Sequence, residues 1–68
     1  MMAEPIRISL KAARVNAGYG VLEAAKLLGV GKDTLLKWEK QPEIVQARYQ
    51  KIISETYQMP IDYIFFGI

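Results

Sequence analysis

The chain contains no cysteine and no histidine among its 68 residues. Without cysteine it can form neither a disulfide framework nor a thiolate metal site. Without histidine it also lacks the commonest zinc ligand and the commonest catalytic base. Its seven acidic residues and four tyrosines form no recognisable acid–base arrangement, and a chain of this length has little room for a deep pocket. We therefore expect no metal, no cofactor, no small-molecule ligand and no enzymatic activity.

Long apolar runs are also missing, because the longest uninterrupted ones extend over only three or four residues. A membrane-spanning helix needs about 20 apolar residues, so we expect no membrane insertion. The N-terminal residues 1–5 lack the basic start and the apolar stretch of a secretory signal. Together these absences predict a cytoplasmic protein.

The chain has no large excess of positive or negative charge. Nine Lys and Arg residues stand against seven Asp and Glu residues, which gives a formal net charge of +2. This balance is compatible with a nucleic-acid partner but does not by itself indicate one. The length predicts one domain over residues 1–68, and such a domain removes only about 60% of its extended-chain surface from water on folding.

Glycine and proline residues divide the chain into short segments, and between them apolar residues recur at spacings of three and four. This periodicity predicts an all-α domain of five helices. Ser9 is a suitable N-cap for the first helix and Gly18 a suitable left-handed residue at its end. Pro42 stops the third helix and Pro60 opens the fifth. Residues 1–8 precede the helices and are expected to be extended or disordered. The expected helices are Ser9–Ala17, Val21–Leu28, Lys32–Lys40, Val45–Tyr57 and a short one that begins near Pro60.

The segment from Val21 to Lys40 has the pattern of two short helices that meet at a sharp angle. Ala25 supplies a small residue where the helix axes approach most closely, and Gly29, four residues later, tolerates a positive φ in the turn. The apolar residues that would point into the angle between the helices are Ala24, Leu28, Val30, Leu35 and Trp38. All these requirements are met together, which favours a DNA-binding helix-turn-helix over a plain helical hairpin.

Around this pattern the chain resembles the lambda-repressor-like helix-turn-helix family, the phage repressor and Cro type of transcriptional regulator. The resemblance extends over nearly the whole chain and rests on four stretches, which are residues 10–14 (LKAAR), 23–30 (EAAKLLGV), 38–40 (WEK) and 60–67 (PIDYIFFG). It implies a five-helix domain that binds operator DNA, usually as a dimer. It also implies a structural ion pair between Arg14 in the first helix and Glu39 at the end of the third. At this length we expect no separate sensing or oligomerisation domain, which favours a Cro-like whole protein of phage origin over a sensor, unless the chain is an excised fragment.

In such a motif the third helix lies in the major groove and its N-terminal part contacts base edges. The face opposite Leu35 and Trp38 carries four candidate base-reading residues: Lys32, Asp33, Leu36 and Lys37. The lysines can donate to guanine O6 and N7, Leu36 can pack on a thymine methyl, and Asp33 can accept from cytosine N4. Candidate contacts to the DNA backbone are Thr34, Lys40, Lys11 and Arg48. For the last two, a role in solubility alone is an equally good interpretation.

Asp33 has a second interpretation, because phosphates repel a carboxylate. In the first turn of a helix it is also favoured by the helix dipole, so it can serve the helix start instead of a base. Two departures from the family pattern weaken the expected backbone contacts. Val21 stands where a phosphate-binding Gln is common, and Glu43 would repel DNA nearby. Gln58 replaces a common Gly at the end of the fourth helix, at some conformational cost.

Several apolar residues are expected to point outward: Leu22, Leu27, Leu36, Tyr63, Phe66 and Ile68. Around the fifth helix we predict core positions for Tyr57, Ile61, Ile64 and Phe65, and a homodimer interface at Phe66 and its neighbours. The leading alternative function is a protein-interaction module on the same fold, antirepressor-like or antitoxin-like, with weak or no DNA binding. The outward leucines, the missing Gln and the small net charge favour that alternative.

Overall fold

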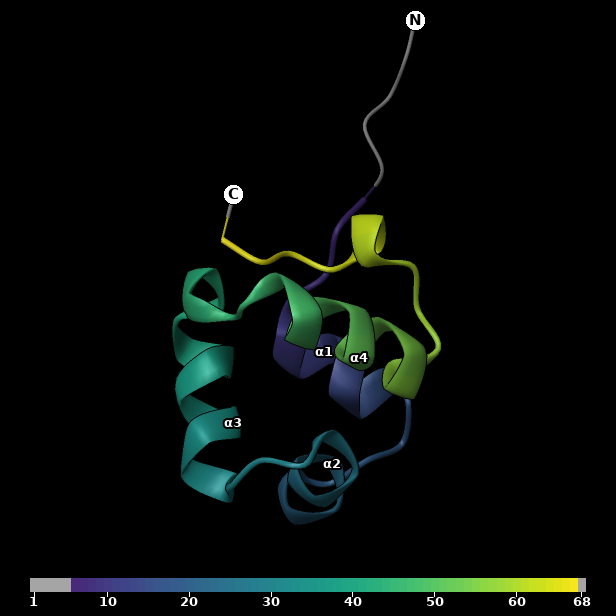
Figure 1. The fold of residues 1–68 in the computed structure, drawn as a ribbon. Coiled ribbons are helices and arrows are strands. Elements are labelled where there is room, and N and C mark those ends of the chain that lie inside the picture. Colours follow the sequence, from purple (N-terminus) through teal and green to yellow (C-terminus); the bar gives the residue numbers. More distant parts are fainter. Residues whose placement is uncertain (1–5, 68) are drawn as a thin grey trace, which may run out of the picture.

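Four α-helices and two 3-10 turns make up the part of the chain that the computed structural model describes, residues 6–67. They are α1 (Leu10–Asn16), α2 (Val21–Leu28), α3 (Lys32–Lys40), η1 (Pro42–Ile44), α4 (Ala47–Tyr57) and η2 (Ile61–Tyr63). No strand occurs within residues 6–67, so the expected all-α class is confirmed (Figure 1). Within the same residues, the helices are too short and too polar for any of them to span a lipid bilayer. Residues 1–5 of the segment expected to be extended, and the outward residue Ile68, lie outside the described range.

The first helix begins and ends within one residue of its predicted bounds. The Ser9 hydroxyl accepts a hydrogen bond from the Ala12 backbone N–H at 3.0 Å, as an N-cap should. After the helix, Gly18 takes a φ of 87°, which a residue with a side chain rarely adopts. Both chemical signals that predicted α1 are therefore used in the fold.

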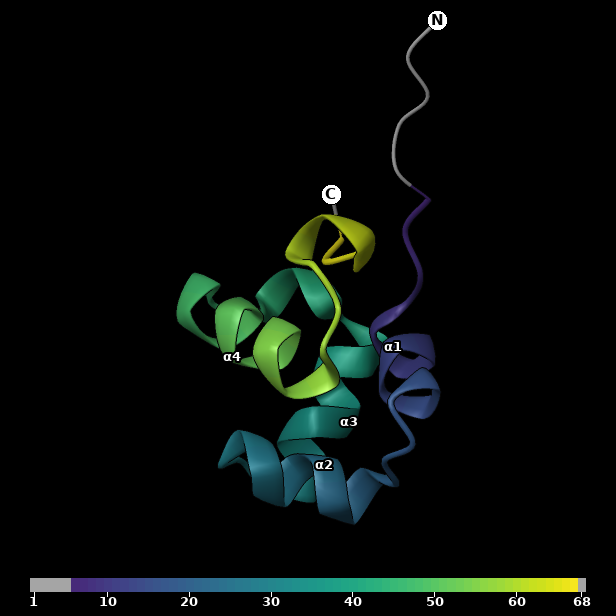
Figure 2. The ribbon, with the colours of Figure 1, turned by 90° about the vertical axis from the view of Figure 1, so that its right-hand side faces the viewer.

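The second and third helices have the predicted bounds and are joined by a tight turn over residues 29–31. Gly29 takes a left-handed φ of 75°, and the Val30 N–H donates to the Ala25 carbonyl at 3.0 Å. Ala25 itself is only 3% exposed, as expected for a small residue at the contact between two helices. The two helices lie at a steep angle to each other, with α3 rising from the end of α2 (Figures 1 and 2).

The fourth helix starts two residues later than predicted. Pro42 opens the separate turn η1, and Val45 then takes an extended conformation before the N-cap Gln46. Val45 is 4% exposed, so the apolar periodicity that placed it in the helix identified a buried residue but not its backbone conformation. At the other end of α4, Gln58 takes a φ of 53°, the left-handed conformation for which we expected a cost at a non-glycine residue.

The fifth helix predicted from Pro60 onward does not form as an α-helix. Ile61–Tyr63 make one 3-10 turn, after which Ile64 forms an isolated parallel bridge with Ile8. The Ile8 N–H donates to the Tyr63 carbonyl and the Phe65 N–H donates to the Ile8 carbonyl, both at 2.8 Å. These two bonds to the N-terminal segment replace the backbone bonds that a further helical turn would have made.

The extended backbone after η2 changes which apolar side chains are buried. Successive side chains of an extended segment point to opposite sides. Ile64 and Phe66 are therefore buried, at 2% and 8% exposure, whereas Phe65 between them is 39% exposed. The prediction that Ile61 and Phe65 belong to the core is wrong, and so is the prediction that Phe66 is exposed. Tyr57 and Ile64 are buried as predicted.

The core fixes α3 from one side only. Leu35 is fully buried, and the Trp38 ring lies 5.0 Å from the Tyr49 ring of α4. In Figure 1, α3 forms the left edge of the molecule, and no other element lies outside it. One long side of this helix is consequently open to solvent.

Candidate nucleic-acid interface

The open side of α3 carries all the candidate contact residues that the sequence assigned to this helix. Each of these six side chains belongs to an exposed residue, and we call the set the α3 flank: Lys32, Asp33, Thr34, Leu36, Lys37 and Lys40. The opposite face of the helix is buried through Leu35 and Trp38. The helix therefore presents three ammonium groups, one carboxylate, one hydroxyl and one leucine outward from a packed support.

Arg14 and Glu39 hold the C-terminal end of α3 against α1. Arg14 Nε donates to Glu39 Oε2 at 2.6 Å and Arg14 Nη2 donates to Glu39 Oε1 at 3.2 Å, which makes the pair bidentate. Both side chains are only 7% exposed. The hydrogen bonds to Glu39 raise the pKa of the Arg14 guanidinium above its ordinary value, although burial opposes this. The structure thus brings together the two residues whose pairing the family resemblance implied.

Arg14 has a second partner that the sequence did not reveal. Its Nη1 donates to the Tyr19 backbone carbonyl at 3.0 Å, so the guanidinium also fixes the loop that leads into α2. One side chain therefore connects α1, the start of the α2 segment and the end of α3. A backbone carbonyl acceptor has no residue-type signature, which is why no sequence pattern could have identified it.

Tyr57 lies close to this ion pair. Burial raises the pKa of its hydroxyl to about 12; the Glu39 carboxylate contributes to the rise and the Arg14 cation opposes it. Among residues 6–67, no protein group forms a hydrogen bond with this buried hydroxyl. The apolar spacing predicted Tyr57 as a core residue but gave no sign that its hydroxyl lies near two charges.

The N-terminal ends of α2 and α3 lack side-chain caps. Gly20 and Gly31 occupy the two N-cap positions, and neither can contribute a side-chain acceptor. The first N–H groups of both helices are therefore available to an anion, and Asp33 and Glu23 are the acidic residues in the respective first turns. The position of Asp33 is compatible with both interpretations of its role.

The remaining two backbone candidates lie on other helices. Lys11 is exposed on α1, and no contact in the described residues links it to α3. Arg48 is exposed on α4, with its guanidinium carbon 5.0 Å from the centre of the Tyr49 ring. That ring also packs on Trp38, so Arg48 is linked to α3 through the Tyr49 ring. Arg48 thus has a packing role that does not depend on DNA.

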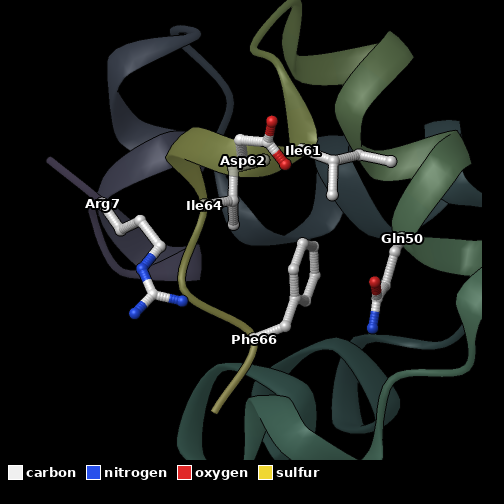
Figure 3. A pocket seen from close by; sticks show the side chains of 6 residues that line it. All are labelled: Arg7, Gln50, Ile61, Asp62, Ile64 and Phe66. Carbon is white, nitrogen blue, oxygen red and sulfur yellow. The ribbon is translucent and has the colours of Figure 1, made fainter. Parts of the chain in front are cut away.

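A cavity of about 210 Å³ lies at the opposite end of the molecule from α2, where the two ends of the described chain meet. Figure 3 shows the Phe66 ring in its centre, Arg7 on one side and Gln50 on the other. Gln50 Nε2 already donates to the Val45 carbonyl at 3.2 Å. Among the described residues, the lining consists of Arg7, Gln50, Ile61, Asp62, Ile64 and Phe66. Nothing in this group forms a nucleophile–base arrangement, and we assign it no chemistry.

The chain has no significant match to a protein-family model, to a curated protein or to a solved structure. Within residues 6–67, acidic side chains also do not gather in a group of three that could hold a metal ion. The α3 flank is therefore the feature of the described residues that bears most directly on function.

Proposed function

We propose that the chain is a sequence-specific DNA-binding transcriptional regulator of the phage repressor or Cro-like type, acting in the cytoplasm. In this proposal α2 and α3 form the helix-turn-helix, and α3 enters the major groove. The observation that carries it is that one helix has three exposed lysines and is buried on its opposite face through Leu35 and Trp38. A rigid helix that displays cations outward is what major-groove binding requires.

Each residue of the α3 flank has a role in this proposal. Lys32 and Lys37 donate to guanine O6 and N7, which is the commonest specific contact made by basic side chains. Lys40, near the end of the helix, contacts a phosphate, and Thr34 contacts a phosphate or a methyl group. The uncapped N–H groups of α2 and α3 offer further phosphate contacts that do not need the missing Gln at Val21.

A salt titration of duplex binding tests this function. Affinity for a random duplex should fall with a log–log slope of about 0.9 for each phosphate contacted. The substitution Lys40→Ala should reduce that slope by about 0.9, the value for one phosphate contact. Lys51→Ala is the matched control, since Lys51 is also exposed but lies on α4. Absence of duplex binding at low salt, or an equal effect of the two substitutions, contradicts the proposal.

We also propose that the protein binds as a homodimer to a pseudo-palindromic operator, with half-sites about one helical turn apart. The corrected burial moves the candidate interface from Phe66 to three neighbours that are 39–49% exposed: Ile61, Tyr63 and Phe65. Sedimentation equilibrium of the wild type and of Phe65→Ser tests this part. A wild-type monomer at the concentrations that saturate the operator would contradict it.

The alternative function is a protein-interaction module, and two residues of α2 favour it. Leu22 is 71% exposed and Leu27 is 51% exposed, and apolar side chains so exposed suit a protein partner. The same salt titration separates the two functions, because binding through an apolar surface does not weaken steeply with salt. The three lysines on α3 make DNA the better-supported partner.

A further inference from the structure

Two residues of the α3 flank differ in chemistry from the lysines around them. Asp33 is exposed, and its carboxylate has no ion-pair or hydrogen-bond partner among the described residues. Leu36 is 43% exposed, whereas the adjacent Leu35 is fully buried. An unpaired carboxylate and an exposed leucine in a cationic surface reduce its affinity for DNA in general. They contribute to DNA binding only if a specific chemical group on the DNA complements them.

The helix places these two side chains beside each other. They are three positions apart, and residues at this spacing on an α-helix have their Cβ atoms about 5–6 Å apart. A carboxylate and an isobutyl group at that separation can converge on neighbouring atoms of one base edge. Asp33 lies in the first turn of α3, the part that approaches base edges most closely in a major-groove helix.

The chemistry of base edges then selects the ligand. A carboxylate accepts a hydrogen bond from cytosine N4 but is repelled by the O4 acceptor of thymine. An apolar side chain packs on a methyl group at C5, which thymine has and cytosine lacks. The pyrimidine that combines an amino group at C4 with a methyl group at C5 is 5-methylcytosine. We propose that Asp33 and Leu36 together recognise 5-methylcytosine in the major groove, an inference that rests on the proposed DNA-binding function.

This recognition makes operator binding responsive to cytosine methylation. Burying one additional methyl group against Leu36 should increase affinity about fourfold. Thymine should bind less well than 5-methylcytosine, because its methyl group is accompanied by an oxygen that faces Asp33. Uracil, which lacks the methyl group and keeps that oxygen, should bind worst of the four pyrimidines.

Two steps test the proposal with the full chain. Bound sequences are first selected from a random duplex pool made with cytosine and from one made with 5-methylcytosine. At the enriched pyrimidine, four matched duplexes then carry 5-methylcytosine, cytosine, thymine or uracil, and their dissociation constants are compared. We expect the 5-methylcytosine duplex to bind about fourfold more tightly than the cytosine duplex.

Two substitutions separate the contributions of the residues. Leu36→Ala should bring the ratio of 5-methylcytosine to cytosine affinity close to one. Asp33→Asn should shift the preference towards thymine, because an amide can donate to O4. Both residues are exposed, so the fold should persist, and thermal melting of each variant checks this.

The outcomes also distinguish this inference from the function on which it rests. If neither pool yields bound duplex, both the DNA-binding function and the inference are wrong. If duplexes bind but methylation changes nothing, DNA binding stands and the inference is overturned. If Asp33→Asn weakens all four duplexes equally, Asp33 serves the helix start, and the inference is overturned as well.

Discussion

Arg14 and Glu39, 25 residues apart in the chain, form a bidentate ion pair with hydrogen bonds of 2.6 and 3.2 Å. The pair connects the last turn of α1 with the end of α3, and it is almost completely shielded from solvent. Because Arg14 also binds the Tyr19 carbonyl, one guanidinium fixes the position of α3 relative to the segment before α2. The orientation of the α3 flank therefore depends on a polar contact inside an otherwise apolar core.

Removing one member of this pair should destabilise the protein strongly. Glu39→Gln leaves the Arg14 cation buried without its counter-charge, and such a loss typically costs about 3–5 kcal/mol. The double substitution Arg14→Met with Glu39→Leu removes both charges and should recover a large part of that loss. Urea unfolding of Arg14→Met, of Glu39→Leu and of the double variant measures the coupling between the two residues. Additive effects in this cycle would show that the ion pair does not couple α1 to α3.

Tyr57 makes stability depend on alkaline pH. Burial raises the pKa of its hydroxyl to about 12, above the ordinary value of 10.0 in the unfolded chain. The folded state thus keeps the proton over a range in which the unfolded state loses it. The contribution of this group to stability is fully present below pH 10.0 and is lost as the pH rises through 10.0 towards about 12.

The substitution Tyr57→Phe should therefore flatten the fall of the melting temperature between these pH values. At neutral pH it should change stability little, because the hydroxyl has no protein partner within residues 6–67. Tyr63→Phe is the control, since Tyr63 is 49% exposed. If the melting temperature of both variants falls at alkaline pH as it does in the wild type, groups other than Tyr57 cause the pH dependence.

The helices were predictable where local chemistry decides the backbone. Ser9 as a cap placed the start of α1 to within one residue, and Gly29 as a left-handed residue placed the end of α2 correctly. The apolar spacing also identified the buried side of α3, and with it the exposed α3 flank. Each of these features depends on residues within a few positions of one another.

Features that depend on distant contacts were not predictable in the same way. The apolar run at Ile64, Phe65 and Phe66 suits a helix or an extended segment equally well, and the bond partners at Ile8 decide between them. Ile8 and Ile64 are 56 residues apart in the chain, so no local sequence pattern contains their pairing. The role of Tyr57 near the ion pair was missed for the same reason.

Gly67 should be required to hold the C-terminal segment in place. Its φ is 90°, and a Cβ atom at this position would lie 2.7 Å from the Glu43 Cβ and 3.0 Å from two Glu43 backbone atoms. Gly67→Ala should therefore cost about 2 kcal/mol from backbone strain and the clash. Because Phe66 precedes it, the substitution should also increase exposure of that buried ring.

Gly31→Ser is the control for this substitution, measured by the same thermal melt. Gly31 has a φ of −77° and no atom within 4 Å of an added Cβ, and a serine there supplies the missing N-cap acceptor. It should keep or slightly raise the melting temperature. If Gly67→Ala has the same melting temperature as the wild type, the contact between Gly67 and Glu43 does not constrain the fold.

Lys37 provides the sharpest test of how the α3 flank reads DNA. It is exposed, belongs to the last turn of α3, and shares the open face with Lys32. Lys37→Ala should weaken binding to the selected operator by about 1–3 kcal/mol and relax the preference at one base pair.

Lys51→Ala, on α4, removes the same charge and should leave that preference unchanged. Dissociation constants for the operator and for a scrambled duplex measure both effects. If Lys37→Ala weakens the two duplexes equally, Lys37 contacts a phosphate, because a backbone contact contributes affinity without distinguishing one sequence from another.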